Sequence, residues 1–151
     1  CIRDSSNAPE EITANLDTIE AAIFSKSGKV SFISEGTLAS SIVDMQFAWQ
    51  RSETITAVKA VTLSEIVASL QLNTVSVIKA AIEGAEYEAF SDSIFFQKYR
   101  PRIVLELPYF EHNIKENPRG DIVALFKSYN YRYEIIEQSG SHLPLLFLNP
   151  N

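Results

Sequence analysis

The chain has 151 residues, 46% of them hydrophobic and 21% charged, a composition typical of one globular domain rather than of a disordered or fibrous chain. Nineteen acidic side chains outnumber thirteen basic ones, and the formal net charge of -6 repels phosphate backbones and anionic lipid headgroups. We therefore expect neither a nucleic acid nor a membrane as partner. The longest apolar runs, such as residues 143–148, are far shorter than the roughly 20 residues of a membrane-spanning helix.

The single cysteine, Cys1, cannot close an internal disulfide or supply two cysteine ligands to a zinc ion within one chain. Cysteine usage therefore favours a cytoplasmic location. The chain does not begin with Met and opens on no signal-peptide pattern, which indicates a processed or truncated end. We expect one α/β domain over residues 1–151, with truncation at its N-terminus left open.

The first half of the chain begins with short runs that favour β structure. Residues 18–24 and 29–33 favour strands, and the polar turn at 25–28 is suited to closing a hairpin between them. Residues 34–54 show no clean period and predict loop. The next run, 55–61, is rich in β-branched residues and predicts a strand.

A helix is predicted to start at Thr62. Glu65 follows three positions later, which is the pattern of a capping box. The spacing of the next apolar residues places four of them on one helical face: Leu63, Ile66, Val67 and Leu70.

The second half of the chain alternates strands and helices, the order typical of a parallel sheet. Residues 75–82 are almost continuously apolar, which predicts a central strand covered on both faces. A helical stripe is predicted from Ala85 through Ile94 to about residue 96, with Arg100 and Pro101 as the stop. The remaining predicted elements are a buried strand at 103–107, a helix opened by Asp121, and antiparallel strands at 131–136 and 143–148.

Ligands of open α/β sheets lie at the carboxyl ends of the parallel strands, so the residues after these strands are the candidates for a site. Glu83 would project there and accept hydrogen bonds from a hydroxyl or an amine, while Gly84 lets the backbone turn sharply or approach a ligand. The alternative is purely structural, because the dipole of the following helix favours acidic residues in its first turn.

Two further charged residues lie within the predicted strands. Lys79 interrupts an apolar run, so its ammonium group must reach the sheet edge or pair with a carboxylate, either Glu83 or Glu106. A role in positioning a substrate and a role in an internal ion pair both fit this placement. Glu106 lies near the end of the second strand, where a carboxylate acts as a base or ligand, or only pairs with Lys79 or Arg102.

His112 lies in the loop after the second strand, on the side where a ligand would bind, and histidine can move protons near neutral pH. The alternative is a solvated loop residue. Two histidines without clustered acidic partners predict no metal site, with a hard oxygen-ligand site around Glu83 left open. No glycine-rich strand-to-helix turn of the kind that cradles phosphates occurs in the chain.

The segment 77–88, Val-Ile-Lys-Ala-Ala-Ile-Glu-Gly-Ala-Glu-Tyr-Glu, resembles the most characteristic stretch of the FkbM family of S-adenosylmethionine-dependent methyltransferases, Lys-Ile-Asp-Val-Glu-Gly-Ala-Glu. Residues 21–32, 61–63 and 101–106 resemble other family segments in order and spacing. The resemblance implies a Rossmann-like class I methyltransferase sheet, mostly parallel with an antiparallel C-terminal hairpin. The family's N-terminal strands and their glycine-rich turn have no counterpart here, so they are missing or rearranged.

The resemblance also implies a function. Such an enzyme would transfer a methyl group from S-adenosylmethionine to a hydroxyl oxygen of a small molecule or glycan, which needs positioning and a group that accepts the hydroxyl proton. The catalytic candidates are Glu83 and Lys79 near the acceptor, Glu106 supporting them, and His112 as a further proton acceptor. The implied cofactor contacts are Ala81, Ile82 and Gly84.

Departures from the family pattern favour an alternative function. Ala81 and Ser64 stand where the family has aspartates, and the glycine-rich cofactor turn is not in this chain. The alternative is a degenerate, non-catalytic methyltransferase-like domain that acts in binding or assembly. A third hypothesis is an incomplete enzyme whose cofactor half comes from upstream residues or another chain. An uncovered sheet edge would also favour homo-oligomers.

Overall fold

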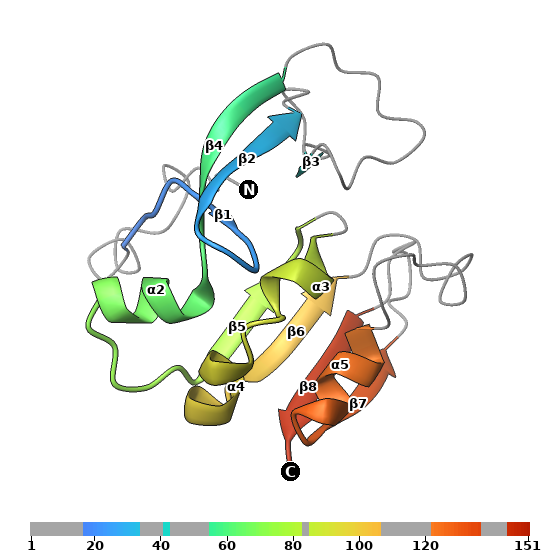
Figure 1. Ribbon diagram of the computed structural model, residues 1–151. Helices are drawn as coiled ribbons and strands as arrows, with labels where there is room; N and C mark the ends of the chain where they lie inside the picture. The colour runs from blue at the N-terminus through green and yellow to red at the C-terminus, as the bar shows by residue number, and fades with distance from the viewer. Residues whose placement is uncertain (1–16, 34–40, 43–54, 83–84, 107–121, 137–144) are drawn as a thin grey trace, which may run out of the picture.

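Figure 1 shows the computed structural model, which describes residues 17–33, 41–42, 55–82, 85–106, 122–136 and 145–151. The first sheet has the strand order β1 (Ala22–Ile23), β4 (Ile55–Val61), β2 (Gly28–Ile33) and β3 (Ser41–Ile42). The second sheet has the order β5 (Val77–Ala80), β6 (Arg102–Glu106), β8 (Leu145–Pro150) and β7 (Tyr131–Ile136). The helices in the described ranges are α2 (Leu63–Ser69), α3 (Glu86–Ala89), α4 (Ser93–Tyr99) and α5 (Ile122–Ser128).

The predicted hairpin between β1 and β2 is wrong, because β4 lies between these strands. Ala60 of β4 is opposite Ala22 in a parallel pair on one side and opposite Gly28 in an antiparallel pair on the other. The polar turn at 25–28 reverses the chain as expected. The turn does not determine whether β1 and β2 pair with each other or with the two edges of the seven-residue strand β4.

The second sheet is mixed, which corrects the prediction of a mostly parallel sheet. Its β5–β6 pair is parallel, whereas β6–β8 and β7–β8 are antiparallel. A parallel pair needs a long crossover, and α3 and α4 lie between β5 and β6 in the chain. The short connection between β7 and β8 permits direct antiparallel pairing, so the predicted C-terminal hairpin is confirmed, with Ile136 opposite Leu145.

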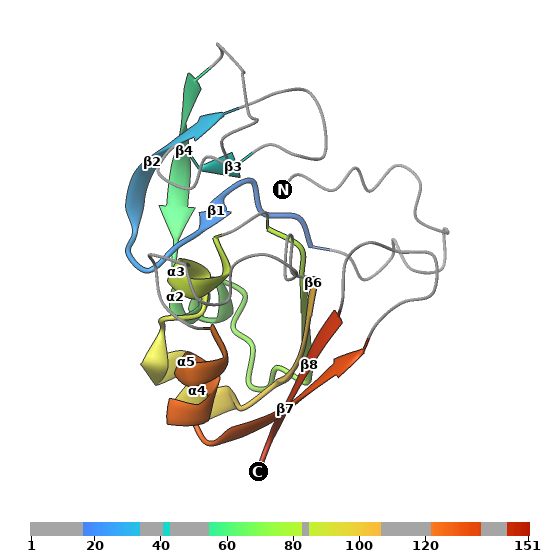
Figure 2. The ribbon, with the colours of Figure 1, turned by 90° about the vertical axis from the view of Figure 1, so that its right-hand side faces the viewer.

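One face of the second sheet carries the core. Figure 2 shows α3, α4 and α5 together on one side of this sheet, to the left of the strands β6, β8 and β7. Alternate strand residues point toward these helices and meet a cluster of aromatic side chains; the buried members are Ile103, Leu105, Leu146, Leu148, Phe90, Phe95, Phe96 and Phe126. Within the described ranges, no helix is long and apolar enough to cross a membrane.

Helix α2 begins where the capping box predicted. The Thr62 hydroxyl accepts a hydrogen bond from the Glu65 N–H at 3.2 Å, and the Glu65 carboxylate accepts one from the Thr62 N–H at 3.0 Å. Ser27 donates a further hydrogen bond to this carboxylate, and the bonds from Ser27 and Thr62 lower the pKa of Glu65. Leu63 and Val67 on the predicted apolar face are buried.

The helix predicted over 85–96 is in fact two helices, because Asp92 starts a new one. Its carboxylate accepts hydrogen bonds from the Phe95 N–H at 3.1 Å and from the Ser64 N–H of α2 at 2.8 Å. Ile94 does not continue the buried stripe, since 72% of it is exposed. The predicted stop is confirmed: Arg100 takes a left-handed conformation with φ 45° directly before Pro101.

Tyr131 joins the C-terminal strands to the end of α4. It is 3% exposed, and its hydroxyl donates a hydrogen bond to the Pro101 carbonyl at 3.0 Å. Burial raises the pKa of Tyr131 to about 12, although the nearby Arg100 guanidinium acts in the opposite direction. An unfolded tyrosine ionises near pH 10, so this contribution to stability is complete below about pH 10 and is lost as the pH rises through about 12.

We expect Tyr131→Phe to flatten the fall in the free energy of unfolding between about pH 10 and pH 12, because no phenol remains to ionise in the unfolded state. At neutral pH the variant loses about 1 kcal/mol, since the Pro101 carbonyl loses its donor. Urea denaturation at stepped pH measures both effects. Tyr133→Phe is the control, because Tyr133 is exposed. If the free energy of unfolding of Tyr131→Phe fell with pH as steeply as that of the wild type, Tyr131 would not be the group responsible for the fall.

Candidate functional site

Lys79 and Glu106 form an ion pair near the carboxyl ends of the two parallel strands. The Lys79 Nζ lies 3.1 Å from the Glu106 Oε2. Lys79 is opposite Val104 in the register of β5 and β6, so its side chain reaches diagonally to the next residue on the same face, Glu106. Glu106 is one of the two partners that the sequence left open for Lys79; the other, Glu83, lies outside the described residues.

This ion pair is on the face of the second sheet that none of the described helices covers. Ile78 and Ala80 of β5 point toward the core, whereas Val77 and Lys79 point to the opposite face. The side chains of Lys79 and Glu106 are 45% and 35% exposed, and Val77 is 60% exposed. The expectation of a central strand covered on both faces is therefore wrong: β5 ends the second sheet among the described strands and buries one face.

The exposure of one face of β5 has a physical cause. An almost continuous apolar run predicts burial on both faces, yet burial also requires a layer of structure on each side. Here the described helices α3, α4 and α5 all lie on one side of the second sheet (Figure 2). The lysine that interrupts the apolar run lies on the uncovered side, where its ammonium group keeps contact with water.

The other predicted site residues divide into two groups. Ala81 and Ile82 follow β5 and are partly buried, and Ile82 packs near Ala85 at the start of α3. Both therefore lie at the same end of the sheet as the ion pair, as the position of a ligand site requires. Glu83, Gly84 and His112 lie outside the described residues, so their roles stay predictions.

Sequence analysis assigned no role to Glu86, a carboxylate that the structure buries. Glu86 is in the first turn of α3 and is 5% exposed. Phe90, four positions later, is also buried, so both residues lie on the inner face of this short segment. The four-residue spacing between Glu86 and Phe90 was the feature of the sequence that could have indicated that Glu86 is buried. Glu86 therefore belongs to the layer of helices on one face of the second sheet, whereas Glu106 points to the other face.

Chemically, the ion pair is adapted to hold a polar ligand and to accept a proton. A carboxylate accepts hydrogen bonds from hydroxyl groups, and the lysine ammonium donates to it or to a ligand oxygen. Because both side chains are partly exposed, a ligand can approach them from solvent. Within the ranges that the structure describes, no cluster of three or more His, Cys, Asp or Glu side chains could hold a metal ion.

Comparison with known proteins defines the class of this domain as a methyltransferase. The model of the methyltransferase FkbM domain matches residues 5–133, most of the chain. The chain therefore belongs to the FkbM methyltransferase family, as the segment 77–88 indicated. No curated protein and no solved structure matches the chain.

Methyltransferases generally use S-adenosylmethionine, but the described residues do not form a complete site for it. The carboxylate of Glu106, which could bind sugar hydroxyls, is engaged by Lys79 at 3.1 Å. The residues just after β5 are the small Ala81 and the apolar Ile82, and no glycine-rich turn follows any strand in the sequence. The described residues therefore supply Glu106 as a hydrogen-bond acceptor for a ligand hydroxyl but no glycine-rich turn for the cofactor.

We expect Lys79→Met to be tolerated, with a loss of about 1 kcal/mol or less in the free energy of unfolding, because a partly exposed ion pair contributes little. Chemical denaturation of Lys79→Met, Glu106→Gln and the double variant measures the coupling between the two side chains. A coupling energy of about 3 kcal/mol would contradict this expectation and show that the pair is desolvated.

Proposed function

We propose that this domain acts in S-adenosylmethionine-dependent methyl transfer to a hydroxyl oxygen of a small molecule or sugar, in the cytoplasm. The observation that carries the proposal is the Lys79–Glu106 pair, exposed to solvent near the carboxyl ends of two parallel strands in an FkbM-family domain. Ligands of parallel sheets bind at this end.

The chemistry of the two side chains supports an oxygen acceptor. A hydroxyl oxygen that gains a methyl group must lose its proton, and a carboxylate within hydrogen-bonding distance can take it. Glu106 would accept the proton, while Lys79 would hold the carboxylate in place before the acceptor arrives. Glu83 and His112, which follow the same strands in the sequence, are further candidates to contact the acceptor.

Calorimetric titration of the 151-residue chain with S-adenosylmethionine and its demethylated product tests the cofactor part of the proposal. Saturable micromolar binding of both supports it. Transfer of a radiolabelled methyl group to a panel of hydroxyl compounds then tests the acceptor part. In that assay Glu106→Gln should lower the rate by about 100-fold, the usual contribution of a positioned base.

Glu134→Gln is the matched control for the transfer assay. Glu134 lies on β7, on the same uncovered face of the sheet as Glu106, because Phe147 is the register partner of both Val104 and Glu134. Its neutralisation should leave transfer unchanged. Absence of binding for both cofactor forms would contradict the enzyme proposal for this chain and favour a non-catalytic methyltransferase-like domain.

A further inference from the structure

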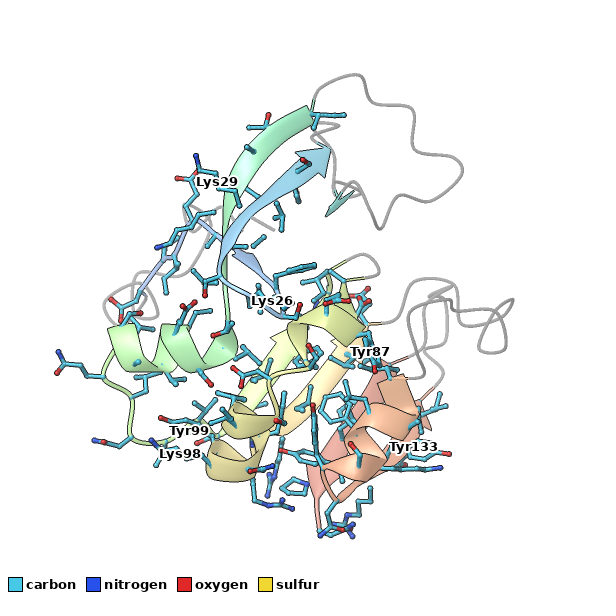
Figure 3. All side chains as sticks on the ribbon, in the orientation of Figure 1. Lys26, Lys29, Tyr87, Lys98, Tyr99 and Tyr133 are labelled. Atoms are coloured by element: carbon cyan, nitrogen blue, oxygen red, sulfur yellow. The ribbon has the colours of Figure 1, made fainter. Side chains whose placement is uncertain are left out.

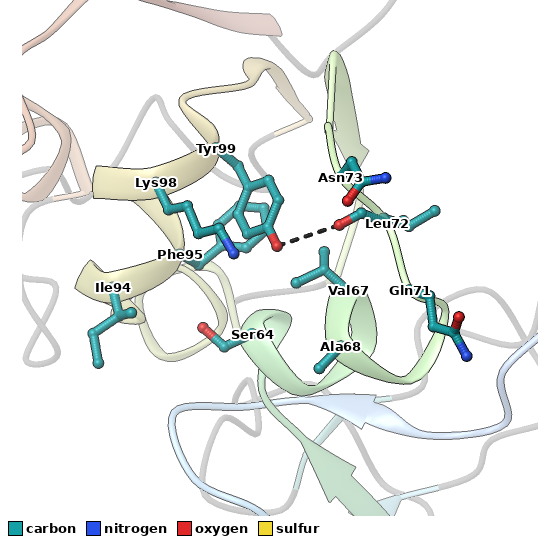
Figure 4. A pocket seen from close by; sticks show the side chains of 10 residues that line it. All are labelled: Ser64, Val67, Ala68, Gln71, Leu72, Asn73, Ile94, Phe95, Lys98 and Tyr99. Carbon is teal, nitrogen blue, oxygen red and sulfur yellow. Dashed lines mark hydrogen bonds between the residues drawn. The ribbon is translucent and has the colours of Figure 1, made fainter.

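A second candidate site lies between α2 and α4, away from the ion pair. The two helices and the segment after α2 enclose a cleft of about 380 Å³ (Figure 4). Asn73 and Tyr99 of its lining precede the amino ends of β5 and β6, whereas Lys79 and Glu106 lie near the carboxyl ends of these strands. The cleft is therefore at the opposite end of the sheet from the proposed methyl-transfer site.

The walls of this cleft are formed by local structure at the end of α2 and by its contact with α4. Helix α2 ends with Gln71 in a left-handed conformation, φ 53°, and the Leu72 N–H donates to the Val67 carbonyl at 2.9 Å. This is the hydrogen bond of a Schellman motif, which turns the chain back across the end of the helix. The Tyr99 hydroxyl then donates to the Leu72 carbonyl at 3.3 Å and joins the returning segment to α4.

The floor of the cleft is apolar. Val67 and Phe95 are almost fully buried beneath it and join the cleft to the hydrophobic core. Leu72 and Ile94 also line the cleft but are 41% and 72% exposed, which leaves large apolar surfaces facing water. Burial of such surface by a ligand is favourable at about 25 cal/mol per Å².

One basic residue is among those that line the cleft. Lys98 lines the cleft, and its Nζ lies 4.9 Å from the centre of the Tyr99 ring, along which the side chain runs (Figure 4). In the described part of the chain Lys98 pairs with no carboxylate, in contrast to Lys79. The ammonium group of Lys98 is the one cationic group among the described residues that line this cleft, whereas the Asp92 carboxylate beside it already accepts two backbone N–H groups, so Lys98 offers the cleft a local attraction for an anion.

We propose that the cleft binds a small amphipathic carboxylate, with its apolar chain on the exposed side chains of Leu72 and Ile94 and its carboxylate at Lys98. The volume lies within the range of small-molecule sites, about 300–1,000 Å³, and both apolar and polar side chains line the cleft, as an amphipathic ligand requires. A lysine suits a single carboxylate because it acts as a compact point charge. The site is independent of the methyl-transfer proposal.

Isothermal titration of the full chain with octanoate, octanol and acetate tests the proposal, because these probes separate the apolar chain from the charge. Octanoate should bind saturably, about fivefold more tightly than octanol, the factor that corresponds to about 1 kcal/mol for one exposed charge pair. Acetate should not bind measurably. In Lys98→Met the affinity for octanoate should fall to that for octanol, which itself should be unchanged.

Lys127→Met is a closely matched control. Lys127 is also a basic residue in the last turn of a helix and lies 5.3 Å from the centre of a tyrosine ring, that of Tyr133. Figure 3 shows Tyr133 and Lys98 at opposite ends of the helical layer, on the right and on the left. Lys127 is not among the residues that line the cleft. Its substitution should leave octanoate binding at the wild-type value.

Ala68→Trp provides an independent test of the location, because Ala68 is an exposed residue that lines the cleft and a larger side chain there would fill it. The variant should lose binding of both octanoate and octanol. Three results would overturn the proposal: no heat with octanoate, equal octanoate affinity in Lys98→Met and wild type, or full binding by a folded Ala68→Trp.

Discussion

Replacing Phe96 by alanine is expected to lower the free energy of unfolding by about 3–5 kcal/mol, the usual cost of removing a fully buried aromatic side chain. Phe96 is 0% exposed and lies at the centre of the aromatic cluster between the sheet and the helices. Its ring centre is 5.0 to 6.2 Å from those of five others: Phe90, Phe95, Phe126, Tyr129 and Tyr131. The substitution removes all these contacts at once and leaves a cavity.

Urea denaturation monitored by circular dichroism measures this loss. Phe96→Leu keeps much of the volume and should lose clearly less, so it remains measurable if the alanine variant does not fold. Ile94→Ala is the matched control on the same helix, because Ile94 is 72% exposed and should change stability by about 0.5 kcal/mol or less. Similar losses for Phe96→Ala and Ile94→Ala would contradict the central position of Phe96.

Asp92→Ala is expected to lower the free energy of unfolding by about 2–3 kcal/mol, because one carboxylate serves two helices. It caps α4 through the Phe95 N–H and also accepts the Ser64 N–H in the first turn of α2, at 3.1 and 2.8 Å. Both N–H groups lose a charged acceptor in the variant. Since Ser64 and Phe95 line the cleft, Asp92 also fixes the separation of its two walls.

Asp92→Ser separates the two contributions. Serine is a good N-cap, so it should restore the bond to the Phe95 N–H, while its shorter uncharged side chain should not replace the bond to Ser64. We expect the loss in this variant, measured by denaturation, to be about half that of Asp92→Ala. A loss below about 0.5 kcal/mol for Asp92→Ala would show that water replaces the carboxylate at both N–H groups.

The candidate site was only partly predictable from the sequence. The pattern of residues 77–88 was sufficient to name the family, and the position of Glu106 near the end of the second parallel strand was sufficient to name it as one of two possible partners of Lys79. Whether Lys79 is buried could not be predicted, because that depends on a layer over the second face of the sheet. Lys98 gave no signal, since a lysine in the last turn of a helix is ordinary until the returning chain after α2 places a cleft beside it.

By itself the sequence determined several local elements and their limits. The capping box at Thr62 and Glu65, the stop at Arg100 and Pro101, and the strands at 55–61 and 131–136 follow from interactions between near neighbours in the chain. The tertiary structure alone decided that β4 lies between β1 and β2, that β5 keeps one face open, and that Asp92 joins two helices. These depend on contacts between distant segments, whose free energy comes from the burial that a whole sheet and its helices achieve together.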